Sequence, residues 1–138
     1  MQPFRHTFRV RYAEVDPQSV VFNSRYLEYA DVLVSEHFRE AKTRGMPDDA
    51  EFHVRRAEVD YLSPIRLDEL IEGRLTVEAI GRSSMKTLIT LHGAEDGGLR
   101  AEIRLLTVHV DLPEGKPTPV PDAVRKAFGF PALEAVDG

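Results

Sequence analysis

The sequence predicts an α+β domain in which a five-stranded antiparallel sheet wraps around one long central helix. Two patterns favour this fold class. Five segments alternate apolar and polar residues with a period of two, and one longer segment repeats its apolar positions at steps of three and four. Most links between the later strands are short, as in antiparallel sheets. A doubly wound parallel sheet would need more helices than the chain offers.

The first strand is expected over residues 4–12. Its apolar side chains fall on one face of a strand, at Phe4, Phe8, Val10 and Tyr12. Asp16 and Pro17 follow, and a proline pushes the preceding residue away from helical geometry. The strand should therefore end there and lead into a loop that runs to Asn23.

The long helix is expected to begin at Asn23 or Ser24, either of which could cap it. One face carries its apolar residues, at Leu27, Ala30, Val34, Phe38 and Ala41. Gly45 followed by Pro47 should end the helix. A helix of this length spans roughly 30 Å, about the width of a small domain.

Four strands should follow the helix, centred on residues 52–61, 75–79, 85–91 and 101–110. The alternation changes phase near Arg55 or Arg56, which predicts a β-bulge. Glycines in residues 93–98 indicate a hairpin loop. The four prolines of residues 112–121 exclude a central strand, and Asp122 could cap a short helix that reaches Phe128.

Composition and charge narrow the class of protein. The chain has 138 residues, enough for one domain over residues 1–138. It lacks cysteine, and its net charge of −5 argues against a nucleic-acid partner. No apolar run is long enough for a membrane span, and the N-terminus lacks the apolar region of a signal peptide. We therefore expect a cytoplasmic protein without a membrane partner.

The segment VRYAEVDPQSVVFNSRYLEYAD resembles the start of the hotdog-fold acyl-CoA thioesterases of the 4-hydroxybenzoyl-CoA thioesterase type. The matching positions are Tyr12, Glu14, Asp16, Asn23, Tyr26 and Tyr29. Residues 61–68, YLSPIRLD, and residues 81–84, GRSS, also look like parts of this family. The resemblance implies a hotdog fold, acyl-CoA substrates without a cofactor, and a site built between two subunits. It also implies self-association as a dimer or dimer of dimers, that is, a homotetramer.

The same resemblance implies that Asp16 is the catalytic carboxylate, acting as base or nucleophile. Backbone N–H groups of residues 20–24 and the Asn23 amide could stabilise an oxyanion at the start of the helix. The expected substrate-binding residues are Tyr12, Ser19, Val20, Phe22, Tyr26, Arg82, Ser83 and Ser84. Of these, residues 82–84 would face the nucleotide of coenzyme A. Glu28 is the reserve candidate for the carboxylate, whereas Tyr29 more simply packs in the core.

The chain departs from the family at two points. Many members have glycine two or three residues after the aspartate, where this chain has Gln18 and Ser19. Many also have histidine where Asn23 stands, and asparagine cannot exchange a proton near neutral pH. These departures leave a non-catalytic acyl-thioester binding module as an alternative function.

An acyl-thioester hydratase or dehydratase is a second alternative on the same fold. Such enzymes generally need a histidine close to the acidic residue, and the first histidine after Asp16 is His37, about a helix length away. The five histidines show no HxxxH or HxH spacing, so we expect no metal site.

Overall fold

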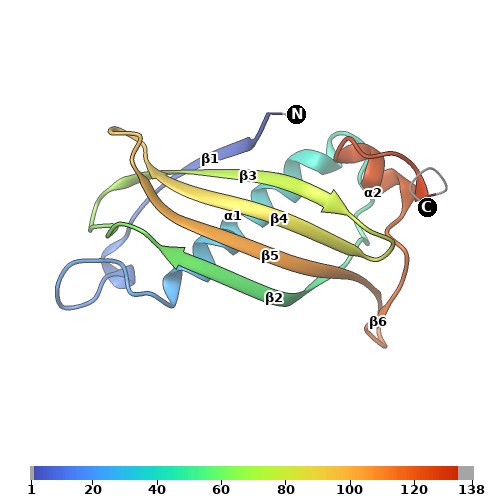
Figure 1. Cartoon of the computed structure of the whole chain (residues 1–138), viewed down its shortest axis with the longest axis horizontal. Coiled ribbons are helices and arrows are strands. Elements are labelled where there is room, and N and C mark those ends of the chain that lie inside the picture. The colour runs from blue at the N-terminus through green and yellow to red at the C-terminus, as the bar shows by residue number, and fades with distance from the viewer. Residues whose placement is uncertain (1, 134–138) are drawn as a thin grey trace.

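The computed structural model describes residues 2–133, in which a curved antiparallel sheet wraps around the helix α1 (Arg25–Lys42) (Figure 1). The strands are β1 (Phe4–Arg9), β2 (Phe52–Tyr61), β3 (Leu70–Ile80), β4 (Ser84–Gly93), β5 (Leu99–Asp111) and β6 (Lys116–Pro117). The sheet order is β1-β3-β4-β5-β2, and β6 pairs with the end of β5. The predicted fold class is confirmed, with one strand more than expected because two residues of the proline-containing tail pair with β5.

The predicted bulge lies in β2, where the pairing with β5 shifts between Val54 and Arg56. Apart from this bulge, β2 pairs with β5 along its full length. Most β2 side chains are nevertheless exposed. Within the described sheet, β2 and β1 are the two outer strands, so the free edge of β2 runs along one side of the molecule.

The core side of α1 differs in phase from the expected one. Leu33 is fully buried, and Ala30 and Ala41 also lie in the core, whereas Leu27 is 44% exposed. Gly73 of β3 explains why Leu33 fits: a Cβ at this position would lie 2.6 Å from a Leu33 methyl carbon. The glycine therefore allows the helix to approach the sheet closely.

A second cluster of buried apolar residues lies beside the C-terminal end of α1 and includes residues of the helix α2 (Asp122–Ala127). Arg125 of α2 is fully buried. Its guanidinium donates hydrogen bonds to the backbone carbonyls of Gly81, Arg82 and Val120. Arg125 thus attaches α2 to the turn between β3 and β4.

The expected side-chain caps do not form. Ser24 occupies the N-cap position of α1, but its backbone is already helical and its side chain makes no capping bond. Pro121 precedes α2, and Asp122 is the first helical residue, whose carboxylate accepts the N–H of Leu133 at 3.0 Å. Across residues 2–133, neither α1 nor α2 combines the length and apolar character needed to cross a bilayer.

Candidate functional site

The loop that links β1 to α1 is held in a defined shape by its own backbone. The N–H of Asp16 donates to the carbonyl of Val20 at 2.8 Å, and the N–H of Ser19 donates to the carbonyl of Asp16 at 2.9 Å. Val15 pairs with Val21 across the base of this turn. The loop is therefore a tight turn with Asp16 at its start.

The Asp16 carboxylate is half-buried, and one of its oxygens is already held. Oδ1 accepts the N–H of Gln18 at 2.8 Å and the N–H of Val20 at 3.4 Å. Within residues 2–133, Oδ2 accepts no hydrogen bond. One oxygen thus orients the group, while the other remains available to a reacting molecule.

Ser19 has a backbone conformation that glycine favours. Its φ is 64°, in the left-handed region that glycine adopts at no steric cost. The carbonyl of Ser19 accepts the N–H of Leu67 at 3.2 Å, which ties the turn to the segment before β3. The chain therefore reaches the left-handed backbone without glycine, at the cost of local strain.

Glu14 lies in the short 3-10 helix η1 (Tyr12–Glu14) and is buried. Its carboxylate accepts the backbone and side-chain N–H groups of Arg11, each at 2.9 Å, and the hydroxyl of Tyr29 at 2.9 Å. Burial alone would raise the pKa of Glu14, but these hydrogen bonds outweigh it and hold the pKa below its usual range. Burial and the Glu14 carboxylate raise the pKa of Tyr29. Glu14 supports the loop and has no acceptor free for catalysis.

A hollow of about 560 Å³ lies between the loop and the start of α1. Its walls include Asp16, Phe22, Ser24, Arg25 and Glu28. No hydrogen bond within the described residues uses the N–H groups of Asn23 and Ser24, at the positive end of the helix dipole. The hollow therefore combines the Asp16 carboxylate with Ser24, whose N–H is unpaired among the described residues.

Tyr61 is a site residue that the sequence reasoning missed. Its hydroxyl donates to the backbone carbonyl of Asn23 at 3.0 Å, so the end of β2 supports the start of α1. The rings of Tyr61 and Tyr26 pack in a T-shaped arrangement, with their centroids 4.8 Å apart. Its only signal in the sequence was its place at the end of the strand predicted for residues 52–61.

The other expected site residues are divided between the hollow, the surface and the core. Phe22 is half-exposed at the hollow, and Tyr12 is 82% exposed on η1. Tyr26 is buried in the core, as is Tyr29, for which core packing was expected. Glu28 lies at the hollow but forms an ion pair with Arg25 at 3.0 Å.

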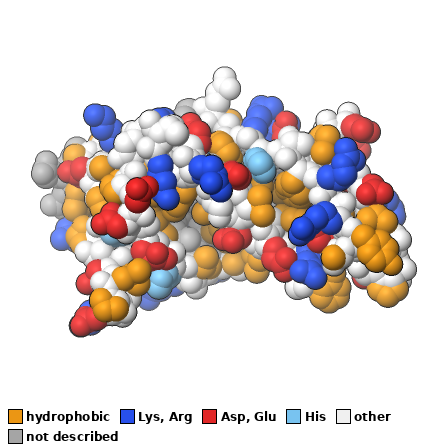
Figure 2. Space-filling model, turned by 180° about the vertical axis from the view of Figure 1, so that it is seen from behind, with side chains coloured by type: hydrophobic (Ala, Val, Ile, Leu, Met, Phe, Trp, Pro, Cys, Tyr) orange, Lys and Arg blue, Asp and Glu red, His pale blue; other side chains and the backbone are white. Residues whose placement is uncertain are grey.

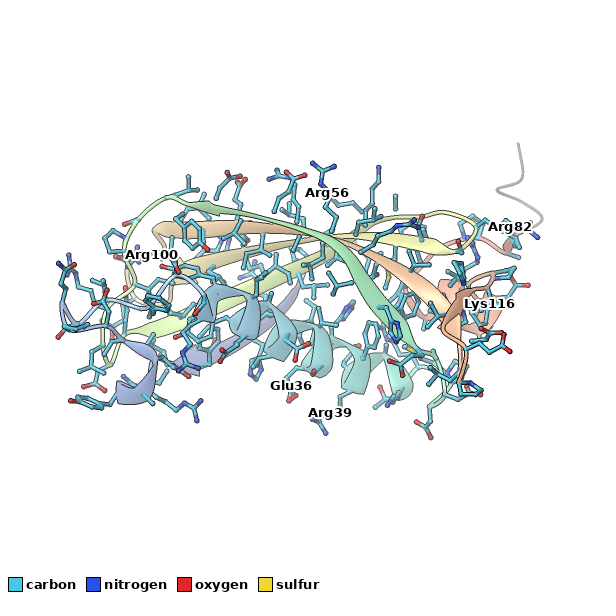
Figure 3. All side chains as sticks on the ribbon, turned by 90° about the horizontal axis from the view of Figure 1, so that it is seen from below. Glu36, Arg39, Arg56, Arg82, Arg100 and Lys116 are labelled. Carbon is cyan, nitrogen blue, oxygen red and sulfur yellow. The ribbon has the colours of Figure 1, made fainter. Side chains whose placement is uncertain are left out.

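Arg82, Ser83 and Ser84 lie far from Asp16 in the same chain. They form the turn between β3 and β4, and the ten residues of β4 separate this turn from the other end of the sheet by roughly 30 Å. Figure 3 shows Arg82 at the end of the molecule opposite Arg100. Within one chain, this turn and Asp16 do not share a site.

Across residues 2–133, no group of three or more histidine and acidic side chains is placed to hold a metal ion. His37 lies between the rings of Phe4 and Phe128, on the part of α1 away from the loop. A histidine beside Asp16, which a hydratase would use, is not found among these residues.

Comparisons with known proteins show the family to which the chain belongs. A family model described as the thioesterase-like superfamily matches residues 10–128. The chain is 28% identical over 130 residues to the acyl-CoA thioester hydrolase YbgC of Escherichia coli O6:H1, with 91% of this chain and 95% of that protein covered.

Solved structures give the same result. A thioesterase from Thermus thermophilus, solved in complex with coenzyme A and Zn, superposes with a TM-score of 0.80 at 29% identity, covering 94% of this chain and 99% of that one. A 1,4-dihydroxy-2-naphthoyl-CoA thioesterase from Synechocystis has the same fold, with a TM-score of 0.81 at 20% identity over 91% of this chain and 95% of that one. The sheet wrapped around α1 is thus the hotdog fold, and the chain belongs to the thioesterase-like superfamily.

Proposed function

We propose that this protein is an acyl-CoA thioesterase that hydrolyses a thioester to a free acid and coenzyme A, with Asp16 as the catalytic carboxylate. The observation that carries the proposal is the arrangement of Asp16 in the hollow. One carboxylate oxygen is held by backbone N–H groups, the other accepts no hydrogen bond among the described residues, and Ser24, whose N–H is likewise unpaired there, lines the same hollow. The names of the relatives support acyl-CoA as the substrate class.

The free oxygen of Asp16 can act in two ways. As a nucleophile it attacks the thioester carbonyl, the C–S bond breaks, coenzyme A leaves as the thiolate, and water then hydrolyses the mixed anhydride. As a general base it takes a proton from water, and the water oxygen attacks the carbonyl instead. In both routes the N–H groups of Asn23 and Ser24 would stabilise the negative charge that develops on the carbonyl oxygen.

The test is release of free thiol from a panel of short, long and aromatic acyl-CoAs. Asp16→Asn should lower kcat by about 10²–10⁴-fold, the usual contribution of a positioned base. Glu28→Gln removes a carboxylate from the same hollow and serves as the matched control, with kcat within a few-fold of the unmodified protein. Full activity in Asp16→Asn, or loss of activity only in Glu28→Gln, would refute the assignment. Mass spectrometry after rapid quenching distinguishes the routes, since only the nucleophile acquires an acyl adduct.

The separation between Asp16 and the 81–84 turn supports a site shared by two copies. The free edges of two β2 strands can pair in antiparallel fashion around a twofold axis, as identical edges do in symmetric dimers. Tyr61 at the end of β2 contacts Asn23, while Phe52 at its start pairs with His109, next to Ser83. Antiparallel pairing would therefore bring the partner subunit's 81–84 turn to the end of the molecule that holds Asp16.

A mixing experiment tests this shared site. Asp16→Asn and a variant with Arg82, Ser83 and Ser84 changed to alanine should each be weakly active alone, the second through a raised KM. Co-expressed, they should form mixed dimers with one intact site and recover up to about half the activity per dimer. Activity of the mixture equal to the sum of the two variants would contradict a shared site.

A further inference from the structure

Two cavities lie on either side of α1, beyond the Asp16 hollow. The first, the α1–β2 cavity, has a volume of about 330 Å³, and its largely apolar walls include Leu27, Val34, Phe38, Val54 and Leu105. The second, the α1–β1 cavity, measures about 640 Å³, and its walls include Phe4, Arg5, Arg44, Phe128 and Phe130. Both volumes fall within the range of roughly 300–1,000 Å³ that is typical of small-molecule sites.

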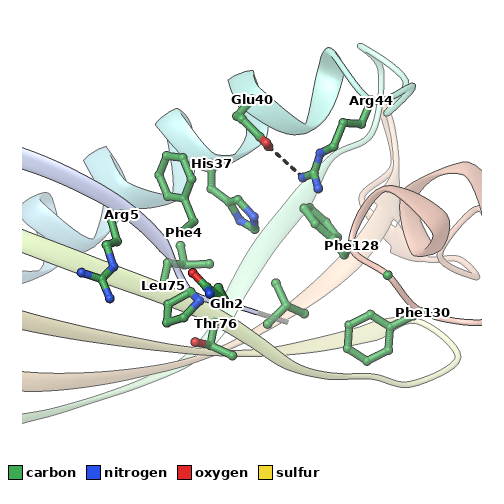
Figure 4. A pocket seen from close by; sticks show the side chains of 13 residues that line it. Gln2, Phe4, Arg5, His37, Glu40, Arg44, Leu75, Thr76, Phe128 and Phe130 are labelled. Atoms are coloured by element: carbon green, nitrogen blue, oxygen red, sulfur yellow. Dashed lines mark ion pairs between the residues drawn. The ribbon is translucent and has the colours of Figure 1, made fainter.

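A thin wall separates the two cavities. His37, Leu75 and Val77 line both of them. Leu75 and Val77 belong to β3, which passes beneath both cavities, so His37 is the part of the wall that α1 contributes. Figure 4 shows His37 projecting from α1 between Phe4 and Phe128. Its ring centroid lies 5.0 Å from each of theirs.

The fold alone does not explain a histidine at this position. His37 is 8% exposed, and its Nδ1 is buried without a hydrogen-bond partner among the described residues, which is unfavourable for a polar atom. Burial, together with the positive charge of Arg44, lowers the pKa of His37 to about 4. The imidazole is therefore uncharged at neutral pH, and an apolar chain can rest against it.

The Asp16 hollow and the α1–β2 cavity follow one another along α1. Ser24 lines the hollow, and Leu27, one turn later, lines the cavity. From Leu27 to His37 the helix advances about 15 Å. An acyl group whose thioester lies at Asp16 can thus extend along the helix until it reaches the imidazole.

We propose that His37 determines acyl-chain specificity by closing the α1–β2 cavity on the side of the α1–β1 cavity. The inference rests on the thioesterase function proposed above and names its substrate class as acyl chains no longer than the path of about 15 Å along α1 that ends against this side chain. A smaller residue would join the α1–β2 cavity to the larger α1–β1 cavity, so that longer chains fit.

Chain-length profiles test the role of His37. kcat/KM is measured for straight-chain acyl-CoAs from butyryl to palmitoyl with the unmodified protein, His37→Ala and His37→Asn. Each variant should raise the ratio of long-chain to short-chain kcat/KM by about tenfold or more, which corresponds to about 1.4 kcal/mol. His53→Ala removes an exposed histidine of β2 and should leave the ratio unchanged. An unchanged ratio in whichever His37 variant folds would overturn the inference.

Binding of free fatty acids separates this inference from the reaction itself. Titration calorimetry with hexanoic to palmitic acid requires no turnover. If the unmodified protein hydrolyses no acyl-CoA, the proposed function fails. Tighter binding of the longer acids by His37→Ala would even then support the role of His37 in limiting the length of the bound chain. Equal chain-length dependence of binding in both proteins would refute it, whatever the activity.

Discussion

The buried hydrogen bond between Glu14 and Tyr29 allows a quantitative test of what holds the loop that carries Asp16. Tyr29→Phe removes a hydroxyl that donates to a carboxylate at 2.9 Å in the core. A hydrogen bond to a charged group contributes about 1.5–3 kcal/mol, so this change should lower the free energy of unfolding by about 2 kcal/mol. Glu14→Ala should cost slightly more, about 3 kcal/mol, because it leaves the Tyr29 hydroxyl buried without an acceptor. The exposed Arg11 side chain can bind water instead and adds little.

The assay is urea unfolding of the unmodified protein, both single variants and the double variant at pH 7. The coupling free energy between the two positions should be about 1–2 kcal/mol. Tyr61→Phe is the matched control: its hydroxyl is half-exposed and donates to a neutral carbonyl at 3.0 Å, so its loss should cost less than about 1 kcal/mol. Thermal midpoints should follow, with a decrease of about 3 °C for each kcal/mol lost.

The pH dependence gives the sign of the effect. The pKa of Glu14 is lower in the folded protein than its unfolded value near 4.5. The stabilisation is therefore complete above that value and is lost as the pH falls through the lower, folded pKa. Coupling below about 0.5 kcal/mol at pH 7, or coupling that persists after the carboxyl group is protonated in acid, would refute this account of the loop.

Two further substitutions test the backbone features of the fold. Gly73→Ala should lower the free energy of unfolding by about 1–3 kcal/mol, because its Cβ would lie within 2.8 Å of Leu33. This cost should be smaller in a Leu33→Ala background, where the side chain at position 33 is shorter. An equal cost in both backgrounds would contradict the close contact. Ser19→Gly should raise the free energy of unfolding by about 1 kcal/mol by removing strain at its positive φ, whereas Gln18→Gly should lower it; urea unfolding in which Ser19→Gly is the less stable variant would exclude strain at this position.

Much of the fold could be predicted because local patterns carry it. The period-two segments became strands, and the phase change near Arg56 became the bulge in β2. The sequence did not determine which face of α1 turns toward the sheet, since apolar residues cover more than half of the circumference of the helix. Such a helix can turn either side inward, and the fit of Leu33 against Gly73, 40 residues away, decides which.

The site could be predicted only where its chemistry is local. Asp16 and the start of α1 are close in sequence, so the turn between them could be predicted from the local residues. The contact between Tyr61 and Asn23 joins residues 38 positions apart, and no periodicity predicts such a pair. The cavities beside His37 likewise arise from packing between α1, β1, β3 and α2. Hydrophobic side chains are also visible on the surface at the α1 side of the molecule (Figure 2). The spacing of apolar residues in the sequence had predicted that such side chains of the helix would be buried.

The buried guanidinium of Arg125 makes α2 and the turn between β3 and β4 a single cooperative unit. Opening α2 would strip hydrogen-bond donors from the carbonyls of Gly81 and Arg82, and disorder in the turn would leave the cation without acceptors. In native-state hydrogen exchange, the amide protons of these two segments should therefore exchange with one shared opening free energy. A ligand held at Arg82 would slow exchange in α2 as well, although the helix does not need to touch it.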